Sequence, residues 1–292
     1  MHPVLFRHPW GEAQTYGSLI LAGVLLTMIG VRFDVRTRRL GAPHTGTFVL
    51  DLYLALAAGV LVGGRLLYAA TTPERTLADP WSVVAPVPTG FVFFGSLLGI
   101  VAAVAVLARL RRVPAGALFD VVATWTPLAH AFGRLGCFAA GCCYGAPTDL
   151  PWGVRFPAGA IVFEDATIAH EGARTVPLHP AQLYEAAMLL AIFAGLLLRR
   201  LRGIPAPWSQ TARYAVAYGL GRFALETLRG DADRRFLLSI PLPPLARWLH
   251  VPEDAPLLLS TSQAVGLAVA AAGWLALRRI RRRRPHRAPD AP

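Results

Sequence analysis

Seven apolar segments of roughly bilayer-spanning length constrain this chain more than any other feature. They lie at residues 16–31, 47–70, 91–110, 114–133, 181–198, 212–228 and 257–277. A transmembrane helix needs about 20 mostly apolar residues. The chain is 54% hydrophobic and only 16% charged, with a mean hydropathy of +0.46, which is too apolar for an ordinary soluble domain. The sequence therefore predicts an all-α integral membrane protein with about seven transmembrane helices.

The distribution of arginine predicts the orientation of these helices. All 29 basic residues are Arg, and 18 of them lie in one set of alternate loops and in the C-terminal tail. Eight lie in the opposite, longer loops. Because basic residues concentrate on the cytoplasmic side of a membrane, we expect the N-terminus outside and the C-terminus in the cytoplasm. The net charge of +12 is thus explained by topology and gives no support to nucleic-acid binding.

The segments between the apolar stretches predict the domain organisation. Residues 1–284 form one seven-helix transmembrane domain with two periplasmic elements. The first element, 135–180, is rich in Gly and Pro and predicts a small strand-and-turn cap. The second, 229–256, contains several prolines and then Trp248, which favours an interfacial loop or short helix. Residues 285–292 predict a disordered basic cytoplasmic tail.

Polar side chains on different apolar segments fall at one depth, in the outer half of the bilayer. They are Tyr16, Arg65, Tyr68, Ser96, His130, Arg134, His179, Gln182, Glu185, Tyr218, Arg222 and Glu226. A charge near the middle of a membrane costs about 2.5 to 3.5 kcal/mol on insertion scales, so such groups pair or line a wet cavity. Buried arginines match phosphate oxygens with a rigid fork of donors. The residues alone therefore predict a lipid-phosphate site that opens outward.

Each of these residues also has a structural interpretation. Arg222 and Glu226 are four residues apart and can form a simple ion pair on one helix face. His130, four residues before Arg134, can be a helix-end histidine that faces water. Arg65 can be an anchor whose head reaches the outer headgroups.

Six short motifs resemble those of the bacterial prolipoprotein diacylglyceryl transferases, in the right order along the chain. The segment Gly-Arg-Leu-Gly-Cys-Phe-Ala-Ala-Gly-Cys-Cys-Tyr-Gly at 133–145 is similar to the signature loop of that family. The others are 16–17, 63–65, 90–99, 179–185 and 218–226, and Ser260 with Gln263 fits as well. The resemblance covers nearly the whole chain.

The resemblance implies an enzyme of the bacterial inner membrane, with its active site facing the outer leaflet. The family transfers the diacylglyceryl group of phosphatidylglycerol to a cysteine thiol in a prolipoprotein signal peptide, leaving a thioether and glycerol phosphate. Arg134 and Arg222 correspond to the two arginines expected to hold the phosphate and stabilise its charge. Other matching positions, expected to bind substrate, are Tyr16, Arg65, Cys137, Gly145, His179, Gln182, Glu185, Tyr218 and Glu226. The resemblance implies neither a cofactor nor a metal.

Three positions depart from the family pattern. Phe94 stands where the family has a His proposed to take the proton of the acceptor thiol, Cys137 replaces an Asn, and Cys142 replaces a Glu. Three explanations stay open: the arginines lower the pKa of the acceptor thiol, His130 acts as the base, or the chain no longer performs this reaction. In the last case it is a paralogue with a different acceptor or lipid, or a non-catalytic phospholipid-binding membrane protein.

Cys137, Cys142 and Cys143 are all the cysteines of the chain. They can be packing residues in a tight loop, or form a disulfide, although the adjacent Cys142 and Cys143 would not easily pair with each other. A cysteine that first accepts the diacylglyceryl group is a further alternative. Metal binding has the least support from the spacing, because there is neither a CxxC motif nor a pair of spaced histidines.

Overall fold

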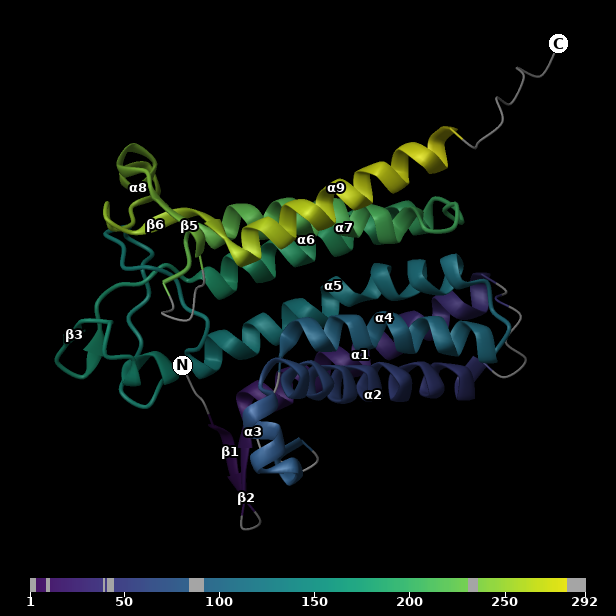
Figure 1. The fold of residues 1–292 in the computed structure, drawn as a ribbon, viewed down its shortest axis with the longest axis horizontal. Helices are drawn as coiled ribbons and strands as arrows, with labels where there is room; N and C mark the ends of the chain where they lie inside the picture. The colour runs from purple at the N-terminus through teal and green to yellow at the C-terminus, as the bar shows by residue number, and fades with distance from the viewer. Residues whose placement is uncertain are drawn as a thin grey trace. The chain divides into compact units, whose positions relative to one another are not determined.

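The computed structural model describes residues 4–8, 11–38, 40, 45–83, 92–230 and 236–282. Within these residues, a helix of 18 residues or more lies at each predicted apolar segment. These helices are α1 (Thr15–Arg38), α2 (Thr45–Thr71), α4 (Phe93–Leu110), α5 (Ala115–Ala140), α6 (Ala181–Leu201), α7 (Ser209–Glu226) and α9 (Thr261–Arg282) (Figure 1). The predicted tail at 285–292 lies outside the described residues.

The helices have the composition of a membrane protein. Within the described residues, α1, α2 and α6 are long and apolar enough to cross a membrane, and α4 is a shorter apolar helix. Leu21, Leu25 and Ile29 follow one face of α1 and are 57%, 52% and 69% exposed. Such exposure of large apolar side chains suits contact with lipid rather than with water. The predicted class, a mainly helical membrane protein, is confirmed.

The chain forms two compact units, and the smaller one spans Met28–Val122. Its centre is a close crossing of α2 and α4, where Gly63 of α2 lies against Gly95 and Gly99 of α4. A Cβ added to Gly63 would lie 2.3 Å from the carbonyl oxygen of Gly95. The hydroxyl of Ser96 donates a hydrogen bond of 2.9 Å to the carbonyl of Val60 across the same crossing. Small residues thus bring the two backbones into direct contact, as in many membrane helix pairs. The short helices α3 (Pro73–Ala78) and η1 (Pro80–Val83) follow α2.

The larger unit comprises Met1–Thr27 and Ala123–Pro292. The hairpin of β1 (Val4–His8) and β2 (Gly11–Gln14) precedes α1. Farther along the chain, α6, α7 and α9 pack beside one another (Figure 1). The carbonyl oxygen of Gly266 in α9 would lie 2.4 Å from a Cβ at Gly219 of α7. The side-chain amide of Gln210 joins α7 to α6 by donating to the carbonyl of Leu196 at 2.7 Å.

The end of α5 corrects the sequence prediction. We expected an extramembrane element from residue 135, but the helix continues to Ala140, so Arg134 and Cys137 lie on its last turns. Gly141, directly after the helix, has a left-handed φ of +75°. The N–H of Gly141 donates to the carbonyl of Phe138 at 3.3 Å, and the N–H of Cys142 to that of Cys137 at 3.1 Å. This is a Schellman motif, which turns the chain back over the helix end.

Residues 141–180, which we call the cap, fold as short strands and turns. The strands β3 (His170–Glu171) and β4 (Arg174–Thr175) pair antiparallel, and η2 (Ile161–Glu164) lies between α5 and β3 in the chain. Phe156, Val162 and Leu178 are fully buried at its centre. The cap therefore has a hydrophobic core of its own.

The segment before α9 also differs from the prediction. The last apolar stretch was expected to start a helix at residue 257, but Leu257 lies in strand β6 (Pro256–Ser260), which pairs with β5 (Phe236–Pro241). The helix begins at Thr261 because Ser260 and Gln263 form a capping box. The hydroxyl of Ser260 accepts from the N–H of Gln263 at 3.1 Å, and Oε1 of Gln263 accepts from the N–H of Ser260 at 3.0 Å. The short helix α8 (Pro243–Leu249) carries Trp248, which is 76% exposed.

Candidate active site

A cluster of charged side chains from α5, α6 and α7 centres on Glu185. One carboxylate oxygen of Glu185 lies 3.1 Å from Nε of Arg134 and 3.9 Å from a terminal nitrogen of Arg222. The other oxygen lies 3.7 Å from Nε2 of His130. Arg222 also contacts Glu226 at 2.6 Å, one turn along α7. The structure therefore brings together five of the predicted site residues, which we call the arginine cluster.

The arginine cluster is buried and its formal charges balance. The Glu185 side chain is 3% exposed, and those of Arg134 and Arg222 are 16% and 14% exposed. Two guanidinium groups face two carboxylates, so neither arginine is an uncompensated buried charge. Nε of Arg134 and one terminal nitrogen of Arg222 are buried and have no hydrogen-bond partner among the described residues, so both guanidinium groups keep donors for an anion. The ion pair expected as a structural alternative for Arg222 and Glu226 is present within this larger network.

Two tyrosines complete the surroundings of the arginine cluster. The Tyr218 ring packs against His130, with ring centroids 5.6 Å apart. Tyr16 packs on α5, where a Cβ at Gly136 would lie 2.9 Å from the Tyr16 ring. His130 therefore lies against Tyr218 and Glu185, and its side chain is 23% exposed.

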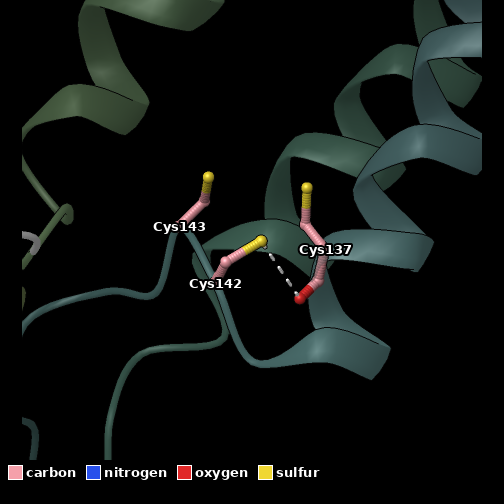
Figure 2. A group of neighbouring side chains, drawn as sticks. All are labelled: Cys137, Cys142 and Cys143. Carbon is pink, nitrogen blue, oxygen red and sulfur yellow. Dashed lines mark hydrogen bonds between the residues drawn. The ribbon is translucent and has the colours of Figure 1, made fainter. Parts of the chain in front are cut away.

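The three cysteines form a second cluster, which begins three residues after Arg134 near the end of α5. Their sulfur atoms all lie within 4.8 Å of one another, and all three thiols are free (Figure 2). The Schellman motif at Gly141 places Cys142 over Cys137, with Sγ of Cys142 3.8 Å from the Cys137 carbonyl oxygen. Cys143 has a left-handed φ of +56°. We call these residues the thiol cluster.

The thiol cluster has polar neighbours on two sides. The amide of Gln182 donates a hydrogen bond of 2.7 Å to the carbonyl oxygen of Cys142. Hydrogen bonds with the thiols of Cys137 and Cys142, and then the positive charges of Arg229 and Arg134, lower the pKa of Cys143. The same thiol contacts raise the pKa of Cys142. The same contacts thus shift the pKa values of Cys142 and Cys143 in opposite directions.

Comparison with known proteins identifies the family. A family model described as prolipoprotein diacylglyceryl transferase matches residues 3–282. The chain belongs to this family. The resemblance predicted from the motifs is thereby confirmed.

Relatives at about 30% identity carry the same name. The phosphatidylglycerol–prolipoprotein diacylglyceryl transferase of Clostridium tetani is 31% identical over 79% of this chain and 86% of the relative. The protein of that name from Geobacter sulfurreducens is 33% identical over 82% of this chain and 86% of the relative. The protein of that name from Rhizobium meliloti is 30% identical over 84% of this chain and 90% of the relative.

His179 and Gly145, two positions that match the motifs of the diacylglyceryl transferase family, lie where the cap meets α6. Nε2 of His179 donates to the carbonyl of Leu249 at 3.1 Å, and Nδ1 lies 3.4 Å from the hydroxyl of Tyr184. Burial lowers the pKa of His179. The N–H of Gly145 donates to the carbonyl of His179 at 3.0 Å, and a Cβ there would meet His179 at 2.5 Å. The described contacts of both residues are thus with the cap and its neighbours, not with the arginine cluster.

Arg65 and Phe94 belong to the Met28–Val122 unit of this transferase-family chain, where Arg65 lies on α2 and Phe94 on α4.

The sequence analysis did not predict one contact of the site. The indole N–H of Trp152 donates a hydrogen bond of 2.7 Å to the hydroxyl of Tyr184, the residue that His179 contacts. Cys142 and Cys143 were not among the predicted substrate-binding residues. Gly141, which precedes them, could have indicated their position, because a glycine that takes a left-handed conformation at a helix end folds the chain back over the helix.

Proposed function

We propose that this chain transfers the diacylglyceryl group of phosphatidylglycerol to the cysteine thiol of prolipoprotein signal peptides. The observation that carries the proposal is the pair of buried arginines, from α5 and α7, held on one carboxylate. Family membership over residues 3–282 and the names of the relatives support it.

The arginine cluster suits displacement of a phosphate leaving group. The acceptor sulfur attacks a glycerol carbon, the carbon–sulfur bond forms, and the carbon–oxygen bond to phosphate breaks. The electron pair leaves on the phosphate oxygen, where negative charge increases. Arg134 and Arg222 provide guanidinium donors that stabilise this charge, and Glu185 fixes their positions before substrate arrives.

His130 is the proposed acceptor of the thiol proton. Its Nε2 lies 3.7 Å from Glu185, and this carboxylate can stabilise the protonated ring. His130, Arg134 and Cys137 have the spacing i, i+4 and i+7, which places them on one face of α5. Tyr16, Gln182, Tyr218 and Glu226 are proposed to line the space for lipid and peptide around this face. We propose His179 and Gly145 as residues that fix the cap on α6, and Arg65 as a contact to a lipid headgroup.

The finer membrane arrangement is part of the proposal. The protein crosses the bacterial inner membrane seven times, with its N-terminus outside, its C-terminus in the cytoplasm and the cap in the periplasm. The distribution of arginine supports this orientation. Trp152 of the cap and Trp248 of α8 are 55% and 76% exposed, as expected for aromatic residues at a membrane surface. The active site would then face the outer leaflet, where exported signal peptides arrive.

The test uses the purified chain in phosphatidylglycerol nanodiscs with a cysteine-containing signal peptide. We expect the peptide to gain the mass of one diacylglyceryl group. Arg134→Ala and Arg222→Ala should each lower the rate at least about 100-fold, the effect of removing one charge-stabilising donor. Arg155→Ala is the matched control, because this arginine is exposed on the cap and paired with Glu171.

Two outcomes would contradict the proposal. If the wild-type chain makes no thioether, it is not this enzyme. If phosphatidylglycerol nevertheless binds and Arg134→Ala abolishes binding, a non-catalytic phospholipid-binding protein explains the same arginines.

A further inference from the structure

Cys137, Cys142 and Cys143 are drawn together by the backbone and not by a bond between them. The helix end at Gly141 folds Cys142 back, and the left-handed backbone at Cys143 brings a third thiol to the same place. A left-handed conformation is unfavourable for a residue with a side chain, so the surrounding structure holds Cys143 in it. Three free thiols with all sulfurs within 4.8 Å thus form a preorganised donor set (Figure 2).

We propose that the thiol cluster is a Zn²⁺ site with an open fourth position, and that the acceptor cysteine of the signal peptide binds there as thiolate. This inference rests on the proposed function and adds the way in which the acceptor sulfur is activated.

The distances fit this ion. Zinc binds thiolates at about 2.3 Å, so three thiolates around one ion lie about 4 Å apart. Sulfur atoms already within 4.8 Å of one another need only small side-chain movements to reach that arrangement. A zinc site with three protein ligands and one open position is typical of catalysis, whereas structural sites have four protein ligands.

The charge balance fits as well. Three thiolates and one Zn²⁺ carry a net charge of −1, and Arg134, one turn before Cys137 on α5, places a guanidinium group beside the cluster. Soft thiolate ligands select zinc or Cu(I) over the harder cations. Of these two, zinc has no redox chemistry, so a bound thiolate can react with carbon without a competing electron transfer.

A second observation points to a ligand at the same place. Gln182 is 1% exposed, and its amide nitrogen donates to the carbonyl of Cys142. Its Oε1 is a buried acceptor without a hydrogen-bond partner among the described residues. A peptide whose cysteine sulfur binds at the cluster brings backbone N–H groups that can satisfy this oxygen.

The chemical step balances with the groups named. Coordination to a divalent metal removes the proton from a thiol, and this proton passes through water to His130, which lies seven residues before Cys137 on α5. The metal-bound sulfur attacks the glycerol carbon, the carbon–sulfur bond forms, and the phosphate oxygen leaves with the electron pair of the broken carbon–oxygen bond. The product sulfur is an uncharged thioether, a poorer ligand than thiolate, so it leaves the metal. No redox partner is needed.

Cobalt and zinc binding test the site directly. The full chain, reduced and placed in phosphatidylcholine nanodiscs that lack the donor lipid, should bind one Zn²⁺. With Co²⁺ it should show thiolate-to-cobalt charge transfer in the near ultraviolet and visible bands of tetrahedral cobalt. The chain has no other cysteine, so these bands can arise only from the thiol cluster. Cys142→Ser and Cys143→Ser should weaken binding, whereas Cys142→His, which keeps a ligand atom, should retain the metal with a changed spectrum.

The acceptor is tested in the same samples. A signal peptide with its cysteine should raise the charge-transfer intensity by about one third, from three thiolates to four. The same peptide with serine in place of cysteine should leave it unchanged. A thermal unfolding scan of each variant shows whether weaker binding reflects loss of the ligand or of the fold.

The outcomes separate this inference from the proposed function. Full thioether formation after removal of the metal overturns the zinc site and leaves the transferase assignment intact. Binding of metal and peptide without any product from phosphatidylglycerol supports the site and refutes the transferase assignment. Absence of Zn²⁺ and Co²⁺ binding by the reduced chain overturns the inference. So do binding that survives simultaneous replacement of all three cysteines, and a disulfide that forms in the presence of Zn²⁺.

Discussion

Glu185→Gln is the most informative single change, because one carboxylate contacts three cationic or titratable groups from two other helices. The variant keeps the shape of the side chain and removes its charge. Arg134 then loses its contact at 3.1 Å, while Arg222 keeps Glu226 at 2.6 Å. Removing one partner of a buried ion pair costs roughly 3 to 5 kcal/mol, since the other charge is left unpaired. Only Arg134 loses its partner, so we expect a loss of about 3 kcal/mol in unfolding free energy.

That loss corresponds to a Tm lower by roughly 6 to 12 °C. The measurement is thermal unfolding in detergent, followed by intrinsic fluorescence. Glu171→Gln is the matched control: it removes the same charge from an ion pair with Arg155 whose two side chains are 57% and 39% exposed. An exposed pair contributes about 1 kcal/mol or less. Equal Tm changes in the two variants would refute the view that Glu185 holds a buried network.

Two further predictions follow from the helix crossing and from His179. Gly63→Ala should lower Tm, because the added Cβ would lie 2.3 Å from the carbonyl oxygen of Gly95. Gly195→Ala is the control: a Cβ there has no atom within 4 Å, so its higher helix propensity should raise Tm slightly. Similar Tm changes in the two variants would contradict the close helix crossing. Burial holds the pKa of His179 below its ordinary 6.5, so the unfolded chain binds more protons below that pH. Stability contributed by His179 is therefore present above pH 6.5 and is lost as the pH falls through the folded pKa, and Tm should fall less between about pH 7.5 and about pH 5.5 in His179→Gln than in the wild type.

The helices were predictable because hydropathy is a local property. Each apolar stretch became a helix, and the pair Arg222 and Glu226 followed from helical spacing alone. The errors lie at helix ends, where a single residue can determine where the helix begins or stops. Leu257 continues the apolar stretch of the last helix, but its strand pairs with β5, and the side chain of Ser260 caps the start of α9.

The arrangement of the site was only partly predictable. Spacing along α5 placed His130 and Arg134 on one face, but no local pattern shows that Glu185 of α6 lies between them and Arg222 of α7. For a related reason the three cysteines were considered together in the sequence, but the meeting of their sulfur atoms was not predicted. Metal-ligand spacing assumes known motifs, whereas here the backbone of Gly141 creates the proximity.

The crossing of α2 and α4 has a consequence for how this part of the membrane domain can move. The N–H of Val92 donates to the carbonyl of Gly64 at 3.1 Å, and Gly63 touches Gly95 backbone to backbone. Two helices in such contact cannot slide or tilt separately without a steric clash, so they move as one rigid unit. Arg65 and Phe94 are sequence neighbours of these contacts, one on each helix. A movement of either helix therefore moves both residues together.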